Sequence, residues 1–199
     1  MCLLFETIRI EDGQPCNLEW HRLRIERSLR ELYGIACCFN LAENIIIPGY
    51  ARNGVFKCRL YYERNIGKVE FEHYRLPVIR SLKVIETGDF DYSYKHTNRS
   101  AIENYFSLRG VCDDILMTRN GMFTDTSFCN VIFDDGKRWV TPANPLLRGT
   151  RRQKLIADGT IAEQEVGVED LGKFKKLILI NAMIAPGDIK PIPVRRIVF

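Results

Sequence analysis

Short strands separated by tight-turn sequences limit the possible fold of this chain more than any other feature. Residues 115–118, 122–124, 130–133 and 139–141 are short, apolar and β-favouring runs. Asn120-Gly121 separates the first two runs and Asp134-Asp135-Gly136 the last two. Such residues favour hairpin turns because they tolerate a positive φ. The pattern therefore predicts an antiparallel meander within a sheet-rich unit.

The first part of the chain has a different organisation. Residues 3–10 alternate like a strand, and the turn sequence Glu11-Asp12-Gly13 should end it. A helix is predicted next, with Asn17 as its N-cap, apolar residues at helical spacing and Gly34 as its stop. Residues 55–63 and 69–74 favour a hairpin. We therefore expect a small α/β domain over residues 1–75.

A linker and a larger domain should follow. Residues 76–81, around Pro77, are the predicted linker, and residues 82–199 form the second domain. Besides the meander, this domain should contain strands at 82–86, 161–166 and 177–180, and helices at 101–108, 149–158 and 168–174. The fold class expected from this pattern is α/β (α+β) with two domains.

Composition excludes several classes of protein. With 46% hydrophobic and 27% charged residues, the chain has none of the bias of disordered sequences. No apolar run approaches the roughly 18 residues that span a membrane, and we expect no signal peptide. The seven cysteines are odd in number and lack a CxxC motif, which favours free thiols and a cytoplasmic location. The three histidines do not have the spacing of a metal site.

The basic residues predict an anionic ligand. The net charge is only +4, but arginines concentrate in two clusters, at residues 22–30 and 148–152. The anion can be a phosphate group, a substrate carboxylate or a nucleic-acid backbone, and counting charges does not decide between them. The sequence has no motif of a nucleotide-binding loop or of an RNA-binding sheet, so we expect no nucleic acid.

Six segments occur in a characteristic order along nearly the whole chain. They are FETIR (5–9), HRLR (21–24), KHTNR (95–99), TDTSFCN (124–130), RGTRRQ (148–153) and INAM (180–183). In this order and spacing the chain resembles the class IV aminotransferases, which are pyridoxal-phosphate enzymes of fold type IV. The resemblance implies a small α/β domain, a larger sheet-rich domain and a homodimer. Because FETIR begins at residue 5, the resemblance is to an N-terminally shortened member.

The resemblance assigns pyridoxal 5'-phosphate to a specific set of residues. Lys95 takes the place of the lysine that binds the cofactor aldehyde covalently and then acts as an acid and base, which requires a primary amine. Asp125 stands where the family normally has a glutamate facing the pyridine nitrogen, and a carboxylate there keeps that nitrogen protonated. Aspartate keeps the charge but is one methylene shorter.

Two further groups complete the implied site. Arg24 takes the place of the phosphate-binding arginine, and the backbone N–H groups of Thr150 and Arg151, after Gly149, would hold the phosphate at a helix N-terminus. Asn181 and Ala182 resemble a turn near the phosphate and the substrate carboxylate.

Two residues of the first domain complete the implied substrate site. Arg59 resembles an arginine that receives this carboxylate, and Thr7 is a possible lining residue. The family resemblance implies a small-molecule substrate.

Several reactions fit this resemblance. KHTNR is closer to the KHLNR of 4-amino-4-deoxychorismate lyases than to the branched-chain aminotransferases, which usually place a tyrosine where this chain has Ser100. The expected reaction releases pyruvate and yields 4-aminobenzoate, a folate precursor. The alternatives are a branched-chain or D-amino acid aminotransferase and a non-catalytic relative acting as a binding protein. A further alternative is a nucleic-acid binder that uses residues 148–154. Its affinity for nucleic acid would fall steeply as the salt concentration rises.

Overall fold

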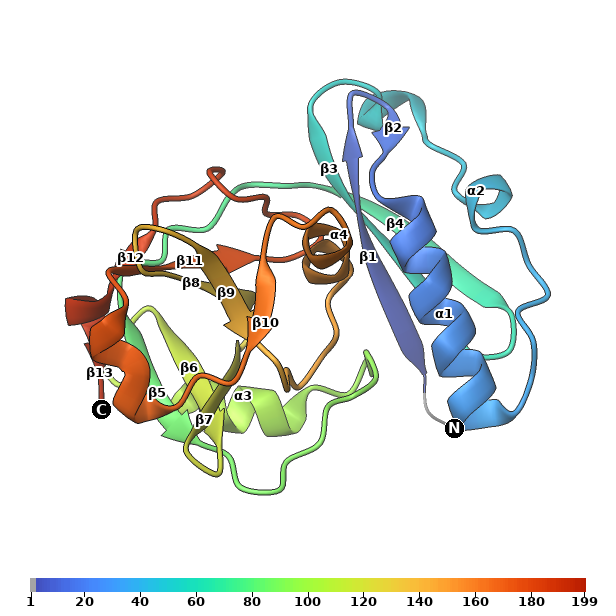
Figure 1. Cartoon of the computed structure of the whole chain (residues 1–199). Helices are drawn as coiled ribbons and strands as arrows, with labels where there is room; N and C mark the ends of the chain where they lie inside the picture. Colours follow the sequence, from blue (N-terminus) through green and yellow to red (C-terminus); the bar gives the residue numbers. More distant parts are fainter. Residues whose placement is uncertain (1–2) are drawn as a thin grey trace. The chain divides into compact units, whose positions relative to one another are not determined.

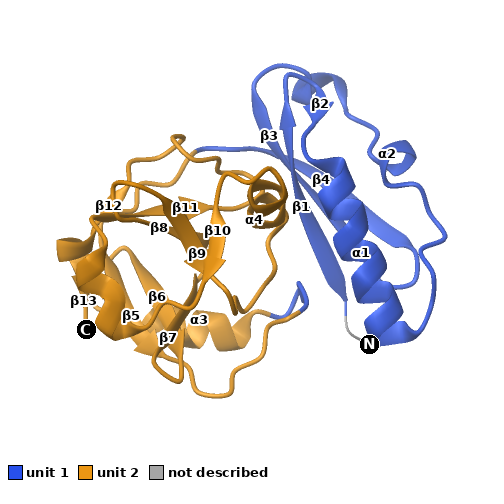
Figure 2. Cartoon of the chain, in the orientation of Figure 1, with its two compact units in different colours: residues 1–75, 94–98 blue, residues 76–93, 99–199 orange. Residues whose placement is uncertain are grey.

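A computed structural model describes residues 3–199, and Cys2 of the seven cysteines lies outside this range. The chain divides into two compact units, coloured separately in Figure 2. Unit 1 extends to Arg75 and also includes Tyr94–Asn98, whereas unit 2 comprises Leu76–Ser93 and Arg99–Phe199. The fold is mixed α/β with few helices. The expected boundaries at 75 and 82 do not anticipate the return of Tyr94–Asn98 to unit 1.

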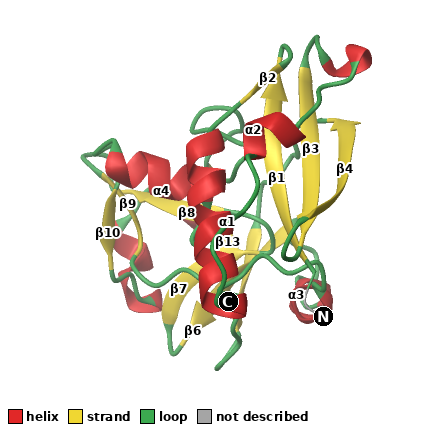
Figure 3. Ribbon diagram, turned by 90° about the vertical axis from the view of Figure 1, so that its right-hand side faces the viewer, coloured by secondary structure: helices red, strands yellow, loops and turns green. Residues whose placement is uncertain are grey.

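Unit 1 is one antiparallel sheet with a long helix. Its elements are β1 (Leu4–Glu11), β2 (Gln14–Pro15), α1 (Leu18–Tyr33), α2 (Leu41–Asn44), the 3-10 helix η1 (Gly49–Ala51), β3 (Val55–Tyr62) and β4 (Ile66–His73). The strand order is β2-β1-β3-β4, and Figure 3 shows β1, β3 and β4 side by side. The predicted strand, helix and hairpin of this region are all present.

The core of unit 1 lies between the sheet and α1. Leu4, Ile8 and Ile10 alternate along β1 and are fully buried, and Ile25 and Leu29 of α1 belong to the same cluster. Burying such side chains gives about 1.5–3 kcal/mol each, so this interface fixes the face that α1 presents to β1. Figure 1 shows α1 running along the sheet.

The two ends of α1 differ in how well the sequence predicts them. Gly34 ends the helix in the left-handed conformation at φ 65°, as predicted. Asn17 occupies the N-cap position, but its side chain makes no capping hydrogen bond. Its φ of 64° is left-handed, whereas side-chain capping needs an extended backbone, so the predicted N-cap position is correct but the cap works without the side chain.

Unit 2 is built around a branched sheet with few helices. Its strands are β5 (Leu82–Glu86), β6 (Asp114–Arg119), β7 (Met122–Thr126), β8 (Asn130–Asp134), β9 (Trp139–Pro142), β10 (Ala162–Gln164), β11 (Lys176–Ile180), β12 (Ile192–Pro193) and β13 (Ile197–Val198). Its helices are α3 (Ser100–Ser107), α4 (Thr150–Ala157) and the 3-10 helices η2 (Val168–Lys173) and η3 (Val194–Arg196). The order is β10-β9-β8-β7-β6-β5-β13, with β11 paired to both β8 and β12.

The meander from β6 to β9 agrees with the sequence prediction. Asn120 and Gly121 both have positive φ, at 52° and 74°, which is the backbone of a tight hairpin turn. Pairing between distant segments adds the rest of the sheet: β5 is parallel to β6 and to β13, and β11 is antiparallel to β8. Among residues 3–199, none of the helices combines the length and the apolar character that crossing a membrane requires.

Candidate functional site

In unit 1, a buried carboxylate connects two of the residues singled out from the sequence. Glu6 lies on the core face of β1 and is fully buried. Arg24 donates from Nε to Oε1 of Glu6 at 2.8 Å and from Nη2 to Oε2 at 2.5 Å. His21 Nδ1 lies 2.6 Å from the same Oε2. Because His21 and Arg24 are one turn apart on α1, both reach one carboxylate.

The charges of this cluster are set by burial and by mutual pairing. Burial alone would raise the pKa of Glu6, but Arg24 and His21 outweigh it and lower this pKa to about 2. Burial lowers the pKa of His21, although Glu6 opposes the shift. Glu6 is therefore ionised at neutral pH and His21 neutral, so Nδ1 of His21 carries the proton donated to Glu6.

The burial of this cluster distinguishes it from the other basic residues of α1. His21 is fully buried and Arg24 is only 8% exposed. The reason is Glu6, which compensates the charge of the guanidinium inside the core. Two of the five N–H donors of Arg24 are directed to Glu6.

Lys95 lies beside the same strand. Its carbonyl accepts a hydrogen bond from Phe5 N at 3.0 Å, and its Nζ lies 4.6 Å from the centroid of the Phe5 ring. The next residue, His96, forms an antiparallel bridge with Leu4. The positive charge of Lys95 contributes to lowering the pKa of His21, although less than burial does. The lysine and the Glu6 cluster therefore share one electrostatic environment.

Arg59 and Thr7 face each other across two strands. Thr7 on β1 is in register with Arg59 on β3, which in turn is in register with Glu70 on β4. Arg59 and Thr7 are partly buried, and Nε of Arg59 is a buried donor without a hydrogen-bond partner in the part of the chain that the structure describes. A buried donor of this kind is suited to an external carboxylate.

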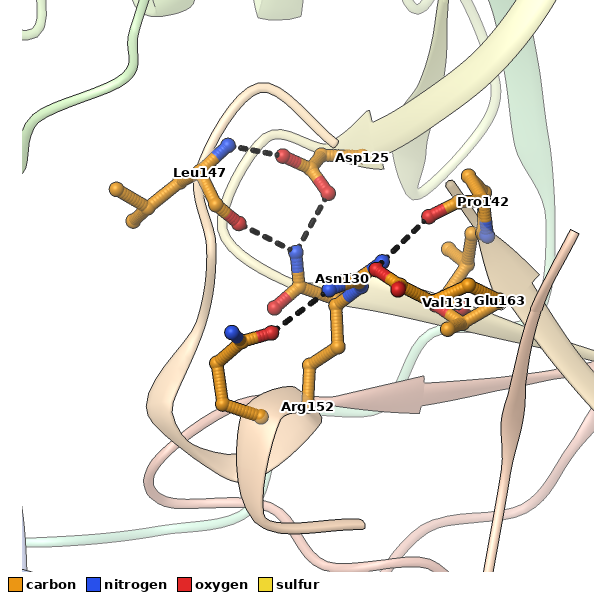
Figure 4. A network of polar contacts seen from close by, with 9 residues as sticks. Asp125, Asn130, Val131, Pro142, Leu147, Arg152 and Glu163 are labelled. Carbon is orange, nitrogen blue, oxygen red and sulfur yellow. Dashed lines mark hydrogen bonds and ion pairs between the residues drawn. The ribbon is translucent and has the colours of Figure 1, made fainter. Parts of the chain in front are cut away.

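In unit 2, Asp125 is held by two hydrogen bonds near the end of β7 (Figure 4). Its Oδ2 accepts from Leu147 N at 2.8 Å and its Oδ1 from Asn130 Nδ2 at 2.6 Å. Asp125 is 5% exposed, and burial raises its pKa to about 6, although both hydrogen bonds and the charge of Arg152 oppose the shift. The carboxylate is therefore mainly ionised above pH 6.

The start of α4 has the features of an anion site. Gly149 is its N-cap, and no side chain caps the helix there. Thr150 is 2% exposed, and Arg151 follows it in the first turn of a helix of 8 residues. First-turn N–H groups carry a partial positive charge and bind anions. The chemistry of these donors therefore fits a phosphate group.

Asn181 forms a tight turn after β11. Its Oδ1 accepts from Met183 N at 2.8 Å and from Ile184 N at 3.0 Å. Arg151 Nε lies 3.5 Å from the carbonyl oxygen of Asn181, and Arg151 Nη2 lies 3.3 Å from that of Ala182. Unit 2 therefore joins Arg151, Asn181 and Ala182 through direct contacts.

Sequence reasoning missed two residues that organise these clusters. Glu6 could have been found as a carboxylate at a core-facing position of an alternating strand, between Leu4 and Ile8. Asn130 carries no comparable signal, because its role depends on Leu147 and Gly149, which are distant in the sequence. Among the described residues, no group of three or more His, Cys, Asp or Glu side chains is arranged to hold a metal ion.

Comparisons with known proteins agree with the resemblance. Residues 3–195 match the family described as amino-transferase class IV. A protein of Haemophilus influenzae without an assigned function is 40% identical over 182 residues, which is 90% of this chain and 97% of that protein.

Two solved structures are also similar. A crystal structure of a proposed 4-amino-4-deoxychorismate lyase from Haemophilus somnus has a TM-score of 0.86 at 36% identity, covering 92% of this chain and 97% of the other. A hypothetical aminotransferase from Mycobacterium tuberculosis, solved with PLP bound, has a TM-score of 0.70 at 18% identity, covering 98% and 81%, and shows the fold alone.

Proposed function

Because the chain belongs to the class IV aminotransferase family, we propose that it is a pyridoxal-phosphate enzyme that converts 4-amino-4-deoxychorismate into 4-aminobenzoate and pyruvate. The observation that supports this reaction most is the similarity, at 36% identity over 92% of the chain, to a proposed lyase of that name. The KHTNR segment, with Ser100 after it, agrees with this choice. The reaction would supply a precursor of folate.

The residues assigned to the cofactor are those that the family resemblance indicates. Pyridoxal phosphate supplies an aldehyde that an amine binds covalently and a ring that accepts electrons from the reacting carbon. Lys95 would form that bond and move a proton at its Nζ. Arg24 would pair with the phosphate through donors not directed to Glu6, and Thr150 and Arg151 would bind it with their backbone N–H groups after Gly149. Asn181 and Ala182 would complete the phosphate end.

Asp125 would face the ring nitrogen. Its carboxylate is mainly ionised above its pKa of about 6, which fits a group that stabilises a protonated ring nitrogen. Each oxygen accepts only one of the two hydrogen bonds described above, and a carboxylate oxygen has more than one acceptor position. The shorter aspartate is therefore compatible with this role.

The substrate carboxylate would bind in unit 1. The buried Nε of Arg59, without a partner among residues 3–199, supports an assignment to a carboxylate, and Thr7 opposite it would line the same face of the sheet. The family resemblance also assigns Asn181 to the substrate. We also propose that the protein is a homodimer and that it is cytoplasmic. Sedimentation velocity of the purified protein would test whether it is a dimer.

The decisive experiment is reconstitution with pyridoxal phosphate. Wild type should develop a visible absorption band and a covalent adduct that borohydride traps, and Lys95→Ala should show neither. Absence of the adduct in wild type would refute the cofactor assignment. Pyruvate release from 4-amino-4-deoxychorismate then tests the lyase reaction. The family description also fits an aminotransferase, which would instead convert 2-oxoglutarate with an amino-acid donor.

A further inference from the structure

Asn130 makes contacts that connect two parts of unit 2. It is the first residue of β8, is 6% exposed, and is in register with Asp125, where β7 pairs with β8. Its Nδ2 donates to Asp125 Oδ1 at 2.6 Å and to Leu147 O at 2.8 Å, as Figure 4 shows. Both hydrogens of this amide group are therefore directed to acceptors.

The other end of the amide lies against Gly149. A Cβ built on Gly149 would lie 2.0 Å from Oδ1 of Asn130, so a side chain at position 149 would displace the amide. A flipped amide would turn an oxygen toward two acceptors, the Asp125 carboxylate and Leu147 O, and lose both hydrogen bonds. The amide is therefore fixed in one orientation by both neighbours.

We propose that Asn130 is a positioning residue that holds the Asp125 carboxylate and the Leu147–Gly149 turn into α4 in a single arrangement. This inference rests on the proposed function, in which Asp125 serves the cofactor ring and the start of α4 serves its phosphate. In this role Asn130 would act through Asp125 and the turn, by keeping these two parts of unit 2 in a fixed arrangement.

The charged groups around Asp125 determine how a substitution of Asn130 changes the pKa of Asp125. Arg152 of α4 lowers the pKa of Asp125, and Cys129, in the turn before β8, also interacts with this carboxylate. Asp114 on β6 interacts with Cys129 as well. The amide of Asn130 is a donor to the ionised form of Asp125, so its loss should raise the pKa of Asp125 further.

The test is Asn130→Asp, which keeps the shape against Gly149 but replaces the donor. When the two aspartates share one proton, the protonated group can donate in place of Nδ2, and when both are ionised they repel. We expect near wild-type affinity for pyridoxal phosphate at about pH 5 and affinity about tenfold to a hundredfold below wild type at about pH 8.5. Asn104→Asp, at an exposed position of α3, is the matched control and should follow wild type at both pH values.

A second measurement needs no cofactor. Carboxyl carbon NMR of the cofactor-free protein should show a higher pKa for Asp125 in Asn130→Ala than in wild type. The proposal would be overturned by an unchanged pKa of Asp125 in Asn130→Ala. It would also be overturned if the affinity of Asn130→Asp for pyridoxal phosphate, relative to wild type, were the same at both pH values. Loss of the fold in Asn130→Asp, seen by circular dichroism, would overturn it as well. Failure of wild type to bind pyridoxal phosphate would count against the proposed function, and the NMR comparison would still decide the role of Asn130.

Discussion

Arg24 and Glu6 form a fully paired ion bridge inside unit 1, with Nε donating to Oε1 at 2.8 Å and Nη2 to Oε2 at 2.5 Å. A carboxylate on the core face of a strand is costly unless it is compensated. Here the compensation comes from the helix that covers that face. The pair therefore ties the packing of α1 on β1 to the orientation of a candidate phosphate ligand.

Replacing Glu6 should destabilise the protein strongly. In Glu6→Gln, Arg24 stays buried without its counter-charge, and we expect the free energy of unfolding to fall by about 3–5 kcal/mol. Urea denaturation at neutral pH measures this change. Glu19→Gln removes a carboxylate from the exposed pair with Arg22 and should leave the midpoint unchanged. Equal midpoints for Glu6→Gln and wild type would contradict the importance of the buried pair.

The stability of unit 1 should decrease in acid. The pKa of Glu6 is lower in the folded state, so its contribution is present above its unfolded value of 4.5 and is lost as the pH falls toward 2. One pKa unit corresponds to about 1.4 kcal/mol, so this shift gives on the order of 3 kcal/mol. The difference in unfolding free energy between wild type and Glu6→Gln should therefore shrink over this range. A difference that stays constant from pH 4.5 to pH 2 would show that Glu6 titrates normally.

His21 should cause a further loss of stability as the pH falls, beginning at a higher pH than the loss due to Glu6. Its pKa is lowered by burial, so folding is favoured by the neutral form above 6.5, and this contribution is lost as the pH falls below 6.5. In His21→Gln the stability should become less dependent on pH just below 6.5. Asp125 acts in the opposite direction, because its raised pKa favours folding as the pH falls through 6. The two variants His21→Gln and Asp125→Asn, measured across this range, separate these contributions.

Gly149→Ala should disturb unit 2. The new Cβ meets Oδ1 of Asn130 at 2.0 Å, and crowding of this kind typically costs about 1–3 kcal/mol. Gly172→Ala on η2 is the matched control, because a Cβ there meets nothing within 4 Å. Thermal unfolding of both variants gives the comparison. Combining Gly149→Ala with Asn130→Ala should recover part of the loss, since the clash disappears.

Lys95→Ala should leave the fold intact. The contact of Nζ with the Phe5 ring contributes about 0.5–1 kcal/mol, and the strand contacts of this segment use backbone atoms. We expect the same circular dichroism spectrum as wild type and a small decrease in the unfolding midpoint. A large loss of structure would make this variant unusable as evidence for a chemical role of Lys95.

Local signals account for the parts of the fold that the sequence predicted. Gly34 ends α1 because glycine adopts φ 65° without cost, and Asn120-Gly121 forms its hairpin for the same reason. The parallel pairing of β5 with β6 and β13 has no local signal, because it depends on which distant strands bury their faces together. Asn17 is the N-cap as predicted, but it makes no capping hydrogen bond, because asparagine suits a left-handed backbone as well as a capping side chain.

In the candidate site, too, local sequence signals are informative and contacts between distant segments are not predicted. The ordered segments led to Lys95, Arg24 and Asp125, but no pattern in them states which neighbours each side chain has. Glu6 binds Arg24 and Asn130 binds Asp125 through contacts that only the tertiary structure provides. The sequence therefore indicates candidate residues for the site but not the side chains that they contact.

The return of Tyr94–Asn98 to unit 1 has a consequence for protein synthesis. The bridge between Leu4 and His96 cannot form until the chain has grown past residue 96, so unit 1 is not complete when residue 75 is made. By the time residue 96 is made, β5 has already been translated, whereas its neighbour β13 begins only at Ile197. An emerging chain would therefore expose an unpaired β5 edge until β13 has been made, which makes this strand a natural site for chaperone binding or aggregation during expression.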